Sequence, residues 1–146
     1  MTGLEEIRIL KVSLDQPFEE PSERTDFLFH KRASDAAAVW CLADLRMPSG
    51  RGLHPAHGEH CSWVELCDLD RYLQRRRFSI NQPVSAPDSL ALDLRMRELH
   101  GEFVGAAHDR ESCLQLLFAL LLVEFQRLSD SAPKTVSSCF SCMWLW

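Results

Sequence analysis

The residues best suited to chemistry follow a short apolar segment near the start of the chain. Asp26-Phe-Leu-Phe29 reads as a strand, and His30 and Lys31 come directly after it. In open α/β sheets ligands gather beyond the carboxyl ends of strands, and a lysine ammonium offers three donors to a phosphate. We therefore predict that His30 and Lys31 contact an anionic ligand. The alternative, a solvated strand end at which Lys31 has no ligand, stays open.

A second set of chemically capable residues lies in a Gly/Pro-rich loop. His54, His57, His60 and Cys61 offer four zinc ligands within eight residues. Structural zinc sites usually take their ligands from two separated pairs, so a solvent-exposed insertion is favoured over a metal site. Near the end of the chain, Cys139 and Cys142 form a lone C-x-x-C pair, which is a weak signal because a second ligand pair is missing. No metal is predicted.

The elements that must position these residues follow from hydrophobic periodicity. Trp63, Leu66, Leu69 and Leu73 recur at helical spacing, and Ser62 with Glu65 forms a capping box. The side chains of Ile7, Ile9, Phe27 and Phe29 are expected in the core, with Lys31 at the ligand-facing edge of the sheet. Expected strands are 7–14, 26–29 and 78–80; expected helices are 33–45, 61–74, 87–104 and 109–128.

Composition narrows the class of protein. The 146 residues amount to one domain, and a net charge of −5 argues against nucleic acid or an acidic membrane surface as the main partner. The apolar run from Leu114 to Val123 is shorter than the roughly 18 residues that a membrane span needs, so it is expected to be a buried helix. The N-terminus shows no signal peptide, so the six cysteines are expected to be reduced in the cytoplasm.

Two stretches of the sequence resemble the N-terminal, pre-ATP-grasp domain of inositol-tetrakisphosphate 1-kinases. In that family a strand, a turn with Pro and two Glu, and a strand ending in His-Lys-x-(Thr/Ser)-Asp follow one another. The matching residues are Leu14, Pro17, Phe18, Glu19, Glu20, Asp26, Phe27, Leu28, Phe29, His30, Lys31, Ser34 and Asp35. A looser likeness covers 62–66, 72–73, 78–83 and 90–95, where Gln82 replaces the family's Asp and Leu94 separates Asp93 from Arg95.

The resemblance implies roles for particular residues. His30 and Lys31 would lie near the inositol polyphosphate, and Arg95 would approach the nucleotide phosphates. An alternative for Arg95, favoured by the one-residue slip, is a surface ion pair with Asp93 or Glu98. The family needs ATP and Mg²⁺, but no region after Leu99 has the length or composition to hold their ligands. The chain is therefore expected to be an inactive fragment of such a kinase, in which Lys31 and Arg95 face one cleft.

The fold implied by the resemblance is α/β, with a small, mainly parallel sheet flanked by helices and a helical C-terminal part. Residues 1–104 would form the kinase-like domain, 105–128 a leucine-rich helix and 129–146 a divergent tail. The eleven residues between the first two strands are marginal for a parallel crossover, so an antiparallel pair is the alternative. The rival function is a non-enzymatic module that binds a protein partner through helix 114–128 and the apolar end, 143–146.

Overall fold

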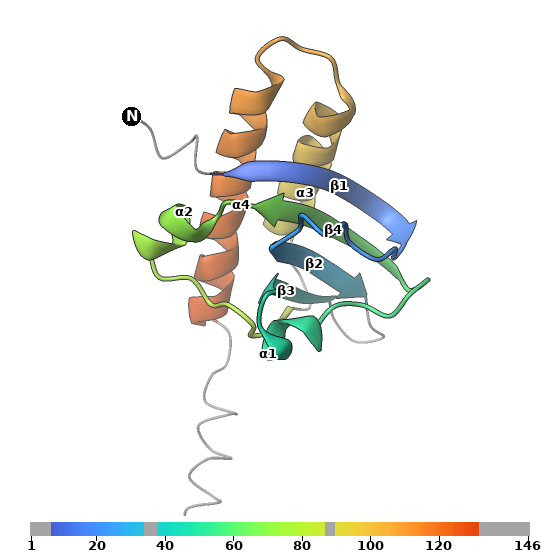
Figure 1. The fold of residues 1–146 in the computed structure, drawn as a ribbon. Coiled ribbons are helices and arrows are strands. Elements are labelled where there is room, and N and C mark those ends of the chain that lie inside the picture. Colours follow the sequence, from blue (N-terminus) through green and yellow to red (C-terminus); the bar gives the residue numbers. More distant parts are fainter. Residues whose placement is uncertain (1–6, 34–37, 87–89, 132–146) are drawn as a thin grey trace, which may run out of the picture.

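A computed structural model describes residues 7–33, 38–86 and 90–131 of the chain. One sheet carries five strands: β1 (Arg8–Pro17), β2 (Phe27–Ala33), β3 (Ala38–Asp44), β4 (His60–Cys67) and β5 (Val84–Ala86). Two long helices, α3 (Leu90–Val104) and α4 (Arg110–Ser131), cover one face of it (Figure 1). The short helices α1 (Pro48–Arg51) and α2 (Asp70–Gln74) lie in the connections.

The sheet is antiparallel throughout, which corrects the expectation of a mainly parallel sheet. Its order is β1-β4-β2-β3-β5, and each neighbouring pair runs antiparallel. β1 and β2 point the same way but are not neighbours, because β4 lies between them. The nine residues 18–26 run back over one face of β4, from the level of His60 to that of Leu66, to join them. The link from β2 to β3 spans only 34–37, and so short a connection joins antiparallel strands.

Two predicted helices are wrong, because the segments form strands. The predicted helix 33–45 contains β3, whose Val39 and Trp40 favour a pleated surface and pair with β2. The predicted helix 61–74 contains β4 and only the single turn of α2. Every residue from Cys61 to Cys67 is buried, so β4 lacks the alternation that marks a half-exposed strand. The short strand is β5, after Pro83, rather than 78–80.

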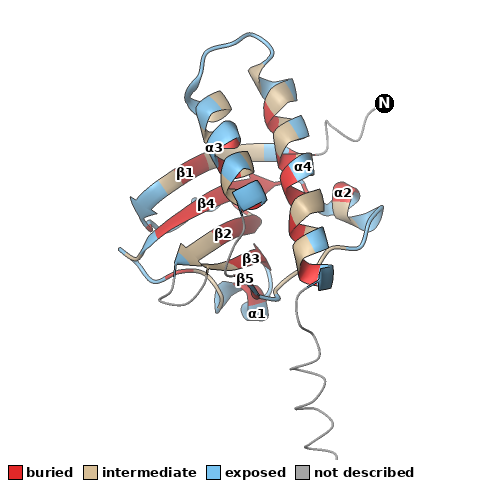
Figure 2. Cartoon of the chain, turned by 180° about the vertical axis from the view of Figure 1, so that it is seen from behind, coloured by how far each residue is buried: buried red, intermediate tan, exposed pale blue. Residues whose placement is uncertain are grey.

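The helical predictions are confirmed by α3 for 90–104 and by α4 for 110–128, while 87–89 lie outside the described residues. The two helices pack against each other and against the sheet, as the view from behind shows (Figure 2). Residues 129–131, expected in the tail, continue α4, while 132–146 lie outside the described residues. Ser34 and Asp35 of the kinase-like motif also lie outside them. α4 buries five large side chains in the core: Leu114, Phe118, Leu121, Leu122 and Phe125.

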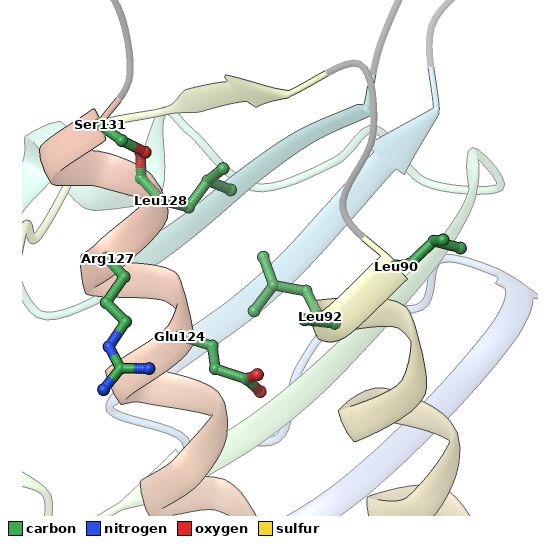
Figure 3. Close-up of a pocket in the computed structure, with 7 residues that line it drawn as sticks. Leu90, Leu92, Glu124, Arg127, Leu128 and Ser131 are labelled. Carbon is green, nitrogen blue, oxygen red and sulfur yellow. The ribbon is translucent and has the colours of Figure 1, made fainter.

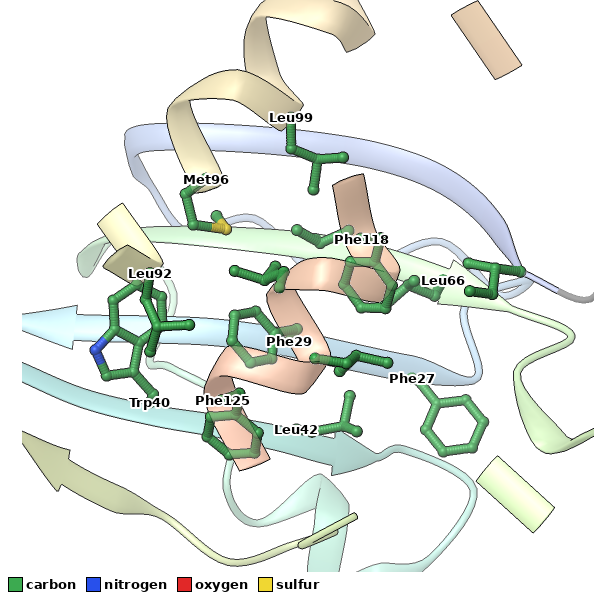
Figure 4. Packing of buried hydrophobic residues seen from close by; sticks show 14 of the residues in the cluster. Phe27, Phe29, Trp40, Leu42, Leu66, Leu92, Met96, Leu99, Phe118 and Phe125 are labelled. Carbon is green, nitrogen blue, oxygen red and sulfur yellow. The ribbon is translucent and has the colours of Figure 1, made fainter. Parts of the chain in front are cut away.

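The main core lies between the sheet and the two helices and is centred on Phe29 (Figure 4). The Phe29 ring stands edge-on to Phe125 at 5.3 Å and to Phe118 at 6.2 Å, and is tilted against Trp40 at 5.6 Å. Such aromatic pairs add to the stabilisation from burial alone. The predicted core positions Ile7, Phe27 and Phe29 are confirmed as buried, whereas Ile9 is only partly buried.

The other face of the sheet carries a second, smaller core beneath two loops. Phe18 packs on Trp63 with ring centroids 4.9 Å apart, and it stacks on His54 at 5.7 Å. Backbone hydrogen bonds between Phe18 and residues 58–59 hold the two loops together. Both faces of the central strands are therefore covered.

Gly50 of α1 passes so close to the Asp44 carbonyl oxygen of β3 that a Cβ at position 50 would lie 1.9 Å from that oxygen.

Candidate functional site

Lys31 lies at the end of β2 on the helix-covered face. Strand alternation places it on the side of Phe27 and Phe29, just beyond the core. Its Nζ donates to Asp93 Oδ1 of α3 at 2.6 Å and stands 5.4 Å from the centroid of the Trp40 ring. Its side chain is 27% exposed. Lys31 is therefore held by a carboxylate of this chain, as well as by an aromatic face.

A small polar cavity of about 130 Å³ opens beside this ion pair. Its lining holds two cations and two carboxylates besides apolar groups: Leu14, Asp15, Lys31, Ser62, Asp93, Met96 and Arg97. Asp15 takes a left-handed backbone conformation, φ 57°, and its N–H donates to Ser62 Oγ at 2.9 Å. Sequence reasoning did not identify Asp15, Ser62 or Arg97, because no local motif marks residues that only the sheet and α3 bring together.

His30 points to the opposite face, so the structure does not bring it to Lys31. It is 2% exposed, and neither ring nitrogen has a hydrogen-bond partner among the described residues. Burial, followed by the charge of Arg32 and the proximity of His54, lowers the pKa of His30 to about 3. A neutral imidazole enclosed in this way packs in the second core and has no access to a dissolved ligand.

Arg95 lies between the two long helices and away from the Lys31 cavity. Its Nη1 donates to Glu98 Oε1 at 2.7 Å, and its Nε donates to Glu124 Oε2 of α4 at 3.0 Å. The predicted alternative, a surface ion pair with Glu98, is confirmed. Arg97, two residues further on, is the arginine that lines the cavity with Lys31. The single cleft shared by Lys31 and Arg95 is not formed.

The four possible zinc ligands of the loop, His54, His57, His60 and Cys61, do not converge. His57 and His60 are exposed, whereas Cys61 is buried in β4, where burial and Glu59 raise the pKa of its thiol to about 11. His54 contacts the Pro55 carbonyl oxygen through Nδ1 at 2.9 Å. In the part of the chain that the structure describes, only Glu102, Asp109 and Cys113 place three ligand atoms within 4.8 Å of one another. Cys139 and Cys142 lie outside that part.

A buried carboxylate, Glu65, joins β4 to the loop that follows β1. It accepts hydrogen bonds from the Trp63 indole Nε1 at 2.9 Å and from the Thr25 hydroxyl at 3.1 Å. The Ser22 backbone N–H lies 3.5 Å from the same carboxylate. Each of these donors holds the loop over the second core. A carboxylate engaged in this way is structural, since it has no free oxygen directed at solvent.

The outer side of α4 differs from these polar sites because it exposes large apolar side chains. Leu116 is 50% exposed and Leu120 is 44% exposed, one helical turn apart. The opposite side of the same helix lies in the core (Figure 2). We call the side of the helix formed by Ser112, Cys113, Leu116, Leu120, Val123 and Arg127, together with Asp109 directly before the helix, the outer face of α4.

An apolar groove of about 260 Å³ lies between the start of α3 and the end of α4 (Figure 3). Leu92 of α3 and Leu128 of α4 lie on its two sides (Figure 3). Leu90, the first residue of α3, borders it and is 69% exposed. The carboxylate that lines it, Glu124, is already paired with Arg95. Its other polar lining residues are Arg127 and Ser131 of α4. All three polar side chains come from one helix, and its opposite side is apolar, so they do not converge as the groups of a catalytic site do.

No family model, curated protein or solved structure matches this chain. We therefore infer its function from its own geometry.

Proposed function

We propose that this chain is a non-catalytic protein-interaction module that binds a helix of another polypeptide along the outer face of α4. The observation that carries the proposal is the exposure of Leu116 and Leu120 on a helix whose other side is anchored in the core. Two leucines on the surface of a rigid helix can bury apolar area with little loss of backbone entropy. A partner helix commonly binds through apolar anchors four residues apart, which is the spacing of Leu116 and Leu120.

The polar residues with chemical potential support an interaction role better than catalysis. Lys31, Arg95 and Glu65 each have partners within the chain, at distances of 2.6 to 3.1 Å. His30 is enclosed and neutral. A catalytic group must be able to reach a reacting atom of the substrate. The hydrogen-bonding groups of Lys31, Arg95 and Glu65 are instead bound to other residues of the chain.

A protein partner is favoured over a lipid membrane. Among the described residues, α4 alone has the length and apolar composition of a membrane span, and 33% of its most apolar window is buried. That buried part includes Phe118 and Phe125, which form the core with the sheet, so crossing a bilayer would dismantle the domain. The outer face carries one acidic residue, Asp109, and one basic residue, Arg127, so it lacks the cluster of basic side chains that anionic headgroups attract.

A second candidate, phosphate binding in the manner of the inositol-phosphate kinases, is supported by the cavity at Lys31. Arg97 and the Ser62 hydroxyl line the same cavity and add donors suited to phosphate oxygens. Asp15 and Asp93 balance the two cations, however, and Lys31 would have to leave Asp93 to bind an anion. The cavity therefore ranks below the outer face of α4, and it is not proposed as a kinase centre.

Site-specific photo-crosslinking in the cells that produce the chain tests the proposal. A photoreactive residue would replace Leu116 or Leu120, and Met47, which is 48% exposed in the connection between β3 and α1, is the matched control. The expected result is a protein adduct from positions 116 and 120 that is missing from position 47 and is lost when Val123→Asp is added. Lipid adducts alone, or equal adducts from all three positions, would overturn the proposal.

A further inference from the structure

The outer face of α4 has a symmetric order of residues. Asp109, Leu116, Leu120 and Arg127 follow one another at spacings of seven, four and seven positions. At 3.6 residues per turn these spacings are close to two, one and two turns, so Leu116, Leu120 and Arg127 share one line along the helix. Asp109 directly precedes α4, and its carbonyl oxygen accepts a hydrogen bond from the Cys113 N–H, so it lies at the start of that line. Position 118 is the midpoint both of the leucine pair and of the Asp109–Arg127 pair.

We propose that the helix bound on this face is α4 of a second copy of the chain, packed antiparallel. The two-fold axis would cross the outer face at the level of position 118 along the helix, midway between Leu116 and Leu120. The inference rests on the proposed function, and it adds the identity and register of the partner. In this register Leu116 of each copy meets Leu120 of the other, so four leucines form the centre of the contact. A two-fold interface needs a self-complementary surface, and the outer face of α4 is one.

The charges at the two ends select the antiparallel direction. Asp109 of each copy would meet Arg127 of the other, which gives two ion pairs beyond the leucines. A parallel arrangement would instead place Arg127 beside Arg127 and Asp109 beside Asp109. Both side chains are exposed, and within the described ranges neither takes part in an ion pair of its own chain. The Asp109 carboxylate lies within 4.8 Å of Cys113 and Glu102, and Arg127 borders the groove beside α3. Like charges in contact oppose association, so the antiparallel direction is favoured.

The same register places Cys113 of one copy opposite Val123 of the other. Both positions flank the leucine pair and are partly exposed. In a dimer of Val123→Cys, Cys113 of each copy would therefore face the new cysteine of the other copy, which gives two equivalent thiol pairs. Disulfides form only when the Cα atoms come within about 7 Å, so this cross-link reports the register and not merely proximity.

Charge exchange is the first test, with the association of the full chain followed by sedimentation. Arg127→Asp alone and Asp109→Arg alone should each raise the dimer dissociation constant by about tenfold or more. The double variant, Asp109→Arg with Arg127→Asp, should return it close to that of the wild type. Single variants that leave the constant unchanged, or a double variant weaker than both singles, would overturn the register.

Oxidation of Val123→Cys in a Cys139→Ser/Cys142→Ser background is the second test. A covalent dimer linking 113 to 123 is expected, and Leu128→Cys in the same background is the control that should not cross-link. Failure of the register is separable from failure of the proposed function. Foreign-protein adducts from position 120 with a monomeric chain would overturn the second-copy inference alone, whereas a monomer that gives no protein adducts would overturn both.

Discussion

At the scale of single residues, most polar side chains that looked suited to chemistry are bound to other residues of the same chain or are buried. Lys31 is bound to Asp93, Arg95 to Glu98 and Glu124, and His30 is enclosed. The position of Lys31 at the end of β2 was predictable from the strand pattern that precedes it. Its partner was not, since Asp93 is 62 residues away in the sequence and only the packing of α3 on the sheet brings the two together.

The buried imidazole of His30 makes a prediction about pH. Its pKa of about 3 in the folded chain lies below the ordinary value of 6.5, so between those values the unfolded chain binds a proton that the folded chain does not. The free energy of unfolding should therefore fall as the pH drops below 6.5, by about 2 kcal/mol at pH 5. His30→Leu should remove that loss and keep full stability at pH 7.

Urea unfolding at pH 7 and pH 5 measures the effect of His30. His57→Gln is the matched control, because His57 is exposed and its loss should leave the pH dependence unchanged. An equal fall in stability for the wild type and for His30→Leu would show that His30 is not the group responsible.

Glu65 gives a second prediction at this scale. Glu65→Ala leaves the Trp63 indole and the Thr25 hydroxyl without their acceptor in a buried place. Each unpaired buried donor costs about 1–3 kcal/mol, so we expect a loss of at least about 2 kcal/mol in the free energy of unfolding. Glu19→Ala, at an exposed position of the same loop, should change it by less than about 0.5 kcal/mol. Equal small effects would contradict the assigned role.

At the scale of elements, long periodic helices were predictable and doubly covered strands were not. α3 and α4 each present one apolar side over several turns, and both were identified close to their bounds. β3 and β4 are covered on both faces, so their sequences show runs of buried residues without alternation. In β4 the positions 63 and 66 matched helical spacing by coincidence, and pairing with β1 and β2 decided the outcome.

The packing of β2 against α4 supports a prediction at the scale of elements. Phe29 is fully buried and contacts Phe118 and Phe125 of α4. Phe29→Ala should lower the free energy of unfolding by about 3–5 kcal/mol, because the cavity left behind cannot close around three rigid rings. Val104→Ala, at a residue that is 66% exposed, is the control and should have little effect. A similar small loss for both variants would remove Phe29 from the centre of the core.

At the scale of the whole molecule, an antiparallel sheet with a helical layer on one face and loops on the other leaves one apolar helix side exposed. The resemblance to inositol-phosphate kinases favoured a parallel sheet, because only local motifs were available and they do not encode the order of the strands. The order arises from pairing between β1 and β4, which lie far apart in the sequence.

The balance of charge in the Lys31 cavity predicts the outcome of a kinase assay. The purified chain, given Mg²⁺ and ATP, should not phosphorylate inositol tris- or tetrakisphosphates, since Asp15 and Asp93 offset Lys31 and Arg97. Product analysis by chromatography is the measurement. Turnover that disappears in Lys31→Ala and persists in Leu94→Ala, an exposed position on α3, would show that the cavity is a working kinase site.

The most direct measurement of the central claim is sedimentation equilibrium of the full chain, with and without Leu116→Asp and Leu120→Asp. Both leucines are about half exposed, so the double variant should keep the wild-type free energy of unfolding. We expect the wild-type mass to rise from one chain to two as concentration increases, and the double variant to stay at one chain. A wild type that remains a single chain at every concentration, or a dimer that survives both substitutions, would contradict the claim.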